Sequence, residues 1–195
     1  MPAYIDIKTG TGPIYNAGYQ VAAYQQADKE NPAGTIVYDD FLHKYTLDGN
    51  PIPGVTTVIN EFFPFPVEFI SEELLFNSSA YGNAVHLATS LDDQGTLDES
   101  SLDPALYGPV EGWRKFKVDM KVKILQNEKI VFSRRRWYAG RLDRVIEWST
   151  KKITRAVINL SDTGYKIIKL EKPADINVFN ACTTLYNEKI RRGIS

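Results

Sequence analysis

Residues 138–148 of this 195-residue chain read YAGRLDRVIEW, and the expected fold is built around this stretch. The run is rich in aromatic, aliphatic and β-branched residues, which predicts a strand. Asp143 lies near its centre, flanked by Arg141 and Arg144. Taken alone, this pattern favours a simple ion pair between Asp143 and one of these arginines over a functional site.

A second strand is predicted at residues 4–8, YIDIK, close to the N-terminus. Because side chains alternate along a strand, Asp6 and Lys8 lie on one face, and Ile5 and Ile7 lie on the other. An Asp and a Lys two residues apart arise by composition in many chains of this length. The triplet therefore carries weight only together with other features.

The rest of the chain alternates between predicted strands and helices. Further strands are predicted at 35–38, 43–47, 128–133, 155–160 and 165–170. Helices are predicted from residue 16 or 18 to 27, over 68–77, around 81–91, from Pro104 to Met120 and after Asp175. A linker is expected at 28–34 and an exposed acidic loop at 92–103. This pattern is typical of a mixed α/β or α+β domain, with a sheet flanked by helices.

The composition is that of an ordinary globular domain. The chain is 43% hydrophobic and 24% charged with a net charge of -1, so any nucleic-acid site must be a local basic patch. The single cysteine, Cys182, cannot form an internal disulfide or a cysteine-held zinc or iron–sulfur site. No signal-peptide pattern opens the sequence and no stretch is regular enough to span a bilayer, so we expect a cytoplasmic protein.

Four short motifs gain meaning as a set. They are GRLDR at 140–144, IDIKTG at 5–10, Gln20 with Tyr24, and Gly82 with His86. Together they resemble the PD-(D/E)xK nuclease superfamily, in particular its RecB-like and phage exonuclease branch. The stretch HKYTLDGNPIPGV at 43–55 is also similar to the N-terminal hairpin of phage members. The resemblance extends over most of the chain.

The resemblance implies a restriction-endonuclease-like core in one domain, 1–195, with a central mixed β-sheet flanked by helices. The IDIK strand and the helix with Gln20, which follow the GxxD strand in the family, stand here at the N-terminus. The domain is therefore divided into a relocated strand and helix at 1–30, a hairpin region at 35–60 and the remaining core at 66–195.

Two arrangements of the relocated strand stay open. It docks beside the Asp143 strand of its own chain, provided that the linker of about seven residues, which reaches at most about 25 Å, is long enough. Otherwise it docks on a second copy and forms a strand-swapped dimer with composite sites.

The same resemblance implies a divalent-metal site. Asp143 and Asp6 would supply carboxylate ligands. Further ligands would be the side chains of His86 and Glu128 and the backbone carbonyl oxygen of Ile7. Mg²⁺ and Mn²⁺ both bind oxygen ligands, and an imidazole favours Mn²⁺. His86 would also help to position the attacking water. Lys8 would orient or activate this water and stabilise the developing charge.

Residues for DNA contact are expected outside this acidic cluster. Gln20 and Tyr24 would contact the DNA strand or brace Lys8, by family resemblance. A basic patch next to aromatic rings suits backbone neutralisation and base stacking, and it comprises Arg134, Arg135, Arg136, Trp137 and Tyr138, with Arg141 close by in the sequence. A row of lysines on the helix after Pro104 is more simply a solvated helix face: Lys115, Lys117, Lys121 and Lys123.

The sequence thus predicts a Mg²⁺- or Mn²⁺-dependent deoxyribonuclease without an iron–sulfur cluster. An exonuclease is favoured over a structure-specific endonuclease. The exonuclease would act in recombination or DNA processing in the cytoplasm of a phage-infected or bacterial host cell. A phage recombination protein would be its partner. The alternative is a catalytically inactive DNA-binding or interaction module on the same fold. Metal binding distinguishes the two.

Overall fold

The computed structural model describes residues 2–9, 16–30, 32–64, 70–149, 153–170, 172 and 174–194. The chain divides into two compact units, each assembled from segments that are distant in the sequence. Unit 1 takes its described residues from 1–13, 66–128 and 143–170, and unit 2 takes them from 14–65, 129–142 and 171–195.

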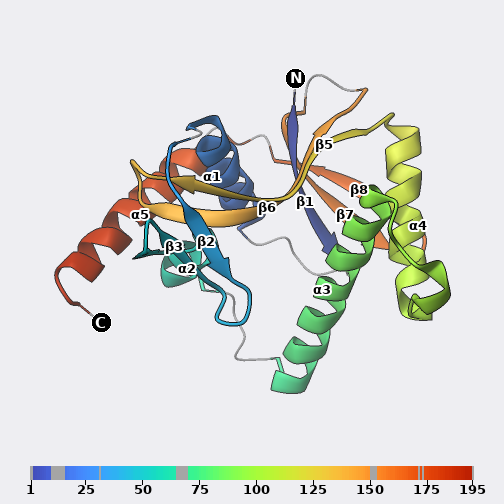
Figure 1. The fold of residues 1–195 in the computed structure, drawn as a ribbon, viewed down its shortest axis with the longest axis horizontal. Coiled ribbons are helices and arrows are strands. Elements are labelled where there is room, and N and C mark those ends of the chain that lie inside the picture. Colours follow the sequence, from blue (N-terminus) through green and yellow to red (C-terminus); the bar gives the residue numbers. More distant parts are fainter. Residues whose placement is uncertain are drawn as a thin grey trace. The chain divides into compact units, whose positions relative to one another are not determined.

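The N-terminal strand lies inside a five-stranded mixed sheet (Figure 1). The order is β5-β6-β1-β7-β8, formed by β1 (Ala3–Thr9), β5 (Lys123–Ser133), β6 (Tyr138–Glu147), β7 (Arg155–Ser161) and β8 (Gly164–Lys169). β1 pairs antiparallel with β6, with Ile5 opposite Arg144, and parallel with β7, with Ile7 opposite Ile158. The expectation that the strand docks beside the Asp143 strand of its own chain is confirmed.

Two helices cover the sheet of unit 1: α3 (Glu72–Gln94) contacts β1, and α4 (Pro104–Asp119) contacts β7 and β8 (Figure 1). Apolar residues spaced by three and four positions along α4 are buried: Leu106, Val110, Trp113 and Phe116, the last two with no exposed surface. Ile5 and Ile7 of β1 belong to the same core. Asp103 caps α4, because its carboxylate accepts a hydrogen bond from the backbone N–H of Ala105.

The described residues of unit 2 form three α-helices and a small antiparallel sheet. The helices are α1 (Ala17–Glu30), α2 (Val55–Phe62) and α5 (Ala174–Arg191), and α5 contacts both others. The sheet has the order β2-β3-β4, formed by β2 (Ile36–Asp39), β3 (Lys44–Leu47) and β4 (Asn50–Ile52). A turn at Asp48 and Gly49 joins β3 to β4, with φ 49° and 79°. Two positive φ values are typical of a type I′ hairpin turn.

The structure corrects several predicted boundaries. α3 is one helix where two were predicted, because Ser71 caps its start and Gly95, with φ 69°, ends it. The start of the predicted helix at 68–77 lies partly outside the described residues, at 65–69. α1 continues to Glu30 into the expected linker, and α2 and β4 arise in a proline-rich stretch for which no element was predicted. A 3-10 helix (Glu99–Ser101) interrupts the expected acidic loop. None of the described helices has both the length and the apolar character to cross a membrane.

Candidate metal centre

Asp6 and Lys8 project from the same face of β1, as the alternation predicts. Asp6 is buried, with its side chain 7% exposed, whereas that of Lys8 is 41% exposed. Lys8 Nζ lies 3.2 Å from Asp6 Oδ1. The other oxygen, Asp6 Oδ2, is buried without a hydrogen-bond partner among the described residues. Buried acceptors are nearly always satisfied, so this oxygen is suited to a bound cation.

Asp143 on β6 reaches back to the neighbouring strand. Its Oδ2 accepts a hydrogen bond of 2.7 Å from the backbone N–H of Ile7. The same oxygen lies 3.6 Å from His86 Nδ1 on α3. Arg141 pairs instead with Asp40, and Arg144 pairs with carboxylates other than that of Asp143. The simpler interpretation of Asp143 as half of an ion pair with a flanking arginine is therefore wrong.

Glu128 joins this group through an unusual backbone conformation. It has φ 49°, in the left-handed region, although it lies within strand β5. Such a residue interrupts the regular alternation of a strand and redirects its side chain. Ligand atoms of His86, Glu128 and Asp143 all lie within 4.8 Å of one another.

A buried arginine holds Glu128 in place. Arg144 Nη1 donates to Glu128 Oε1 at 2.8 Å, and Arg144 Nε donates to Asp93 Oδ2 at 2.7 Å. The Arg144 side chain is fully buried, and its guanidinium lies 5.7 Å from the centroid of the Trp113 ring. Its Nη2 also donates to Thr89 Oγ1 at 3.4 Å. Asp93 thus orients Arg144, and Arg144 in turn orients the carboxylate of Glu128 within the cluster.

Asp93 is a residue that sequence reasoning missed. The stretch 92–103 was expected to be a solvent-exposed loop, yet Asp93 lies in the last turns of α3 with its side chain 1% exposed. Its Oδ1 accepts from Trp113 Nε1 and from Lys117 Nζ, both at 2.8 Å. The signal available was the pair of adjacent aspartates before the glycine that ends the helix.

The electrostatics of the cluster follow from its burial. Loss of solvent and, to a smaller extent, the nearby carboxylates of Asp6 and Glu128 raise the pKa of Asp143 to about 7, although His86 and Lys8 oppose this shift. The Asp6 carboxylate raises the pKa of the Lys8 ammonium. Carboxylates that lie close together and are largely shielded from solvent repel one another unless protons or a cation neutralise them. Because three carboxylates and one imidazole converge here, the donor set suits a divalent cation such as Mn²⁺ or Mg²⁺.

The residues predicted for DNA contact lie in unit 2. Gln20 is half-buried on α1, and Arg135 and Arg136 lie in the turn between β5 and β6. Tyr24 is buried on α1, where its ring occupies the space left by Gly140: a Cβ there would meet Tyr24 Cε1 at 2.4 Å. Tyr24 therefore has a packing role in unit 2.

Several of the basic residues predicted to contact DNA, or lying near them, form ion pairs with acidic side chains of the protein. Arg141 pairs with Asp40 at 3.3 Å and lies 5.3 Å from the centroid of the Tyr38 ring. The predicted row of lysines does not form a basic patch. Lys115 pairs with Asp119, Lys117 pairs with Asp92 and Asp93, and Lys121 and Lys123 lie beyond the end of α4.

Comparisons of the chain with protein-family models, with curated proteins and with solved structures each find no match. The geometry of the site is therefore the basis for a functional assignment.

Proposed function

We propose that this chain is a divalent-metal-dependent nuclease that hydrolyses phosphodiester bonds in DNA and acts as an exonuclease on a restriction-endonuclease-like core. One observation carries the proposal. Asp6, His86, Glu128 and Asp143 come together in unit 1 from four different elements, and Lys8 lies beside Asp6. Such an arrangement of acids around a lysine supports metal-assisted phosphodiester hydrolysis.

Each residue has a role that follows from its position. Asp6, Asp143, Glu128 and His86 would hold the metal, with the backbone carbonyl of Ile7 as a further donor. A divalent cation stabilises negative charge on the phosphate and makes a bound water more acidic. Lys8 remains protonated at neutral pH, because Asp6 raises its pKa. Its ammonium group would donate hydrogen bonds that orient the attacking water and stabilise the phosphate oxygens.

The proposal extends to the substrate and its setting. Arg135, Arg136 and Arg141 would neutralise the DNA backbone, and Gln20 would contact the strand. Tyr24 would support that contact from its buried position. The expected setting is a phage or bacterial cytoplasm, in recombination or DNA processing.

The test compares the wild type with Lys8→Ala on end-labelled linear DNA and on closed circular DNA, with Mg²⁺, Mn²⁺ or EDTA. We expect loss of linear DNA only, in either metal, and a drop in rate of roughly 10²–10³-fold in Lys8→Ala, typical of a lost charge-stabilising donor. Lys115→Ala is the matched control, because Lys115 is exposed and pairs only with Asp119 among the described residues. It should cleave like the wild type.

Two other outcomes would change the assignment. Cutting of the circular DNA would indicate an endonuclease. If a folded protein cleaves neither substrate in Mg²⁺ or Mn²⁺ and binds no Mn²⁺ by calorimetry, the alternative of a catalytically inactive DNA-binding or interaction module is favoured.

A further inference from the structure

Two cavities in unit 2 meet at the turn between β5 and β6. The smaller, of about 390 Å³, is lined by Arg135, Arg136 and Trp137 from the turn and by Asn187 and Arg191 from α5. The larger, of about 620 Å³, shares Trp137, Asn187 and Arg191 with it. Both volumes lie in the range of small-molecule sites, roughly 300–1,000 Å³. Trp137 therefore borders both cavities.

The turn is held in a fixed conformation. The backbone N–H of Trp137 donates to the carbonyl of Ser133 at 2.8 Å, and the N–H of Arg136 donates to Ser133 Oγ at 3.0 Å. From α5, Asn187 Nδ2 donates to the carbonyl of Arg136 at 2.9 Å. Trp137 has φ 57°, which is rare for a bulky residue. A strained conformation that neighbouring groups enforce is a recurrent feature of ligand sites.

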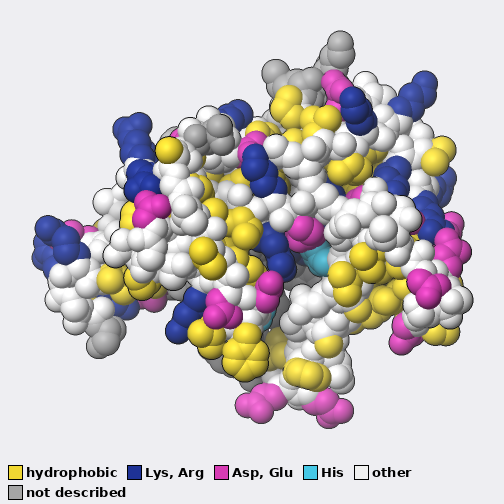
Figure 2. Space-filling model, viewed as in Figure 1, with side chains coloured by type: hydrophobic (Ala, Val, Ile, Leu, Met, Phe, Trp, Pro, Cys, Tyr) yellow, Lys and Arg dark blue, Asp and Glu magenta, His cyan; other side chains and the backbone are white. Residues whose placement is uncertain are grey.

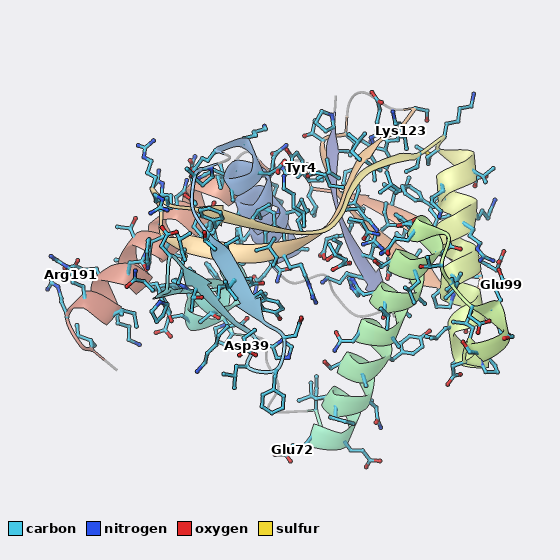
Figure 3. All side chains as sticks on the ribbon, in the orientation of Figure 1. Tyr4, Asp39, Glu72, Glu99, Lys123 and Arg191 are labelled. Atoms are coloured by element: carbon cyan, nitrogen blue, oxygen red, sulfur yellow. The ribbon has the colours of Figure 1, made fainter. Side chains whose placement is uncertain are left out.

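The smaller cavity is cationic. Its one acidic residue, Glu188, pairs with Arg191 at 2.8 Å. The side chains of Arg135 and Arg136 form no ion pair within the described part of the chain. Figure 2 shows Lys and Arg side chains, in dark blue, over this turn and the C-terminal part of α5, where Figure 3 labels Arg191.

The larger cavity is mainly aromatic and apolar. Tyr45, Tyr186 and Trp137 supply rings, and Ile52 and Ile190 supply aliphatic surface. Trp137 is partly buried and packs against the core cluster that contains Leu47, Ile52 and Phe132. A ligand that fills both cavities must carry negative charge at one end and a flat, apolar group at the other.

We propose that these two cavities bind single-stranded DNA, with a base against Trp137 and the adjoining phosphates on Arg135 and Arg136. Nucleotides combine an anionic phosphate with a flat ring, and aromatic side chains stack on bases of any sequence. In a duplex the faces of the bases are covered by stacking, so only a single strand or an unpaired end offers them. The choice of DNA rests on the proposed function, which the inference deepens by naming the single strand.

The first measurement is binding of a labelled oligo(dT) of about eight nucleotides, within the site sizes of single-strand binding folds, in EDTA so that no cleavage occurs. Trp113 and Trp148 are buried, so quenching of tryptophan fluorescence reports on Trp137. We expect quenching by oligo(dT) and weaker binding of a blunt duplex of equal length. By anisotropy, Trp137→Ala should weaken binding roughly tenfold, and Trp137→Phe should retain most of it.

The arginines are tested through salt dependence. Arg135→Ala and Arg136→Ala should each lower the slope of log K against log salt by about 0.7, as expected for one phosphate contact on a single strand. Lys166→Ala, which removes an exposed charge on β8, should leave the slope unchanged.

Two results would overturn the proposal: wild-type affinity in Trp137→Ala, or equal quenching and competition by polyglutamate, which would indicate an acidic-peptide site. A protein that binds oligo(dT) in EDTA but never cleaves DNA contradicts only the nuclease activity. A protein that cleaves linear DNA but shows no effect of Trp137→Ala contradicts only this site.

Discussion

Arg144 places its guanidinium between two carboxylates, that of Asp93 at 2.7 Å and that of Glu128 at 2.8 Å. The side chains of Arg144 and Asp93 are almost completely removed from solvent. A buried ion pair adds little net stability compared with apolar residues, but loss of one partner leaves an uncompensated buried charge. Arg144, the neighbour of the candidate ligand Asp143, therefore holds Glu128 of the acidic cluster and also contributes to the stability of unit 1.

We predict that Arg144→Met lowers the free energy of unfolding by about 3–5 kcal/mol, because Asp93 is left buried without this cation. Urea denaturation followed by circular dichroism measures the change. Arg135→Met is the matched control, and its free energy of unfolding should stay within about 0.5 kcal/mol of the wild type, because Arg135 is exposed. Equal stabilities of the two variants would contradict the role of Arg144.

Asp143 gives a prediction for pH dependence in the metal-free protein. Its pKa, about 7 in the folded state, is above that of an unfolded aspartate, about 3.9. The stability that it contributes is therefore full below the unfolded value and is lost as the pH rises through about 7. Asp143→Asn keeps an oxygen that can accept from Ile7 N–H but does not titrate.

We expect the free energy of unfolding of the wild type, relative to Asp143→Asn, to fall between about pH 5 and about pH 8 in EDTA. Denaturation in urea at both pH values measures this difference. Saturating Mn²⁺ should restore stability to the wild type at the higher pH, because the cation neutralises the carboxylates. A difference independent of pH would show that Asp143 keeps an ordinary pKa.

At the level of secondary structure, β1 is the element on which the candidate site depends. It lies between β6 and β7 and carries Asp6 and Lys8 on one face. Its other face places Ile5 and Ile7 in the core. β1 and β6 are far apart in the sequence and no tight turn joins them, yet the strands pair and Asp143 accepts a hydrogen bond from the Ile7 N–H. Burial of the isoleucines and the backbone ladder thus replace the turn.

Ile7→Ala should cost about 2–5 kcal/mol of unfolding free energy, because Ile7 is fully buried and its truncation leaves a cavity. Ile190→Ala in α5 makes the same chemical change at a side chain that is 60% exposed. Its cost should be below about 1 kcal/mol. Chemical denaturation of both variants tests the difference, and a small effect of Ile7→Ala would mean that β1 contributes little to the core.

For the molecule as a whole, the division into two units separates the two proposed activities. All of the candidate metal ligands belong to unit 1, whereas the cavities beside Trp137 belong to unit 2. Ligands that bind only the folded state stabilise the region that holds them.

Hydrogen exchange with and without Mn²⁺ tests this separation. We predict slower exchange in β1 and in the part of α3 around His86 when Mn²⁺ is present, because the ion would link these elements. Backbone amides of β2, β3 and β4 that exchange through local opening should have the same exchange rates with and without Mn²⁺. Uniform protection of both units, or protection confined to unit 2, would contradict the assignment of the metal to the cluster around Asp6.

Much of the fold could be predicted from residue patterns that act locally. The alternation in residues 4–8 placed Asp6 and Lys8 on one face, and the spacing of apolar residues predicted α4. The β7–β8 hairpin also follows from local turn chemistry. Secondary structure was predicted wrongly where one local pattern fits two structures. The serines inside α3 are also typical of a helix N-cap, and the prolines near α2 and β4 favour a loop.

Part of the candidate site was likewise foreseeable. Asp6, Lys8, His86 and Asp143 could be named from the sequence because they lie in short motifs, whereas Glu128 could be named only through the family resemblance. Three features were decided only in three dimensions: the docking of β1 within its own chain, the left-handed conformation of Glu128, and the burial of Arg144 with Asp93. Each depends on contacts between segments far apart in the chain. Sequence periodicity reports the face of an element, whereas tertiary packing fixes which elements share that face and which charges lose their solvent.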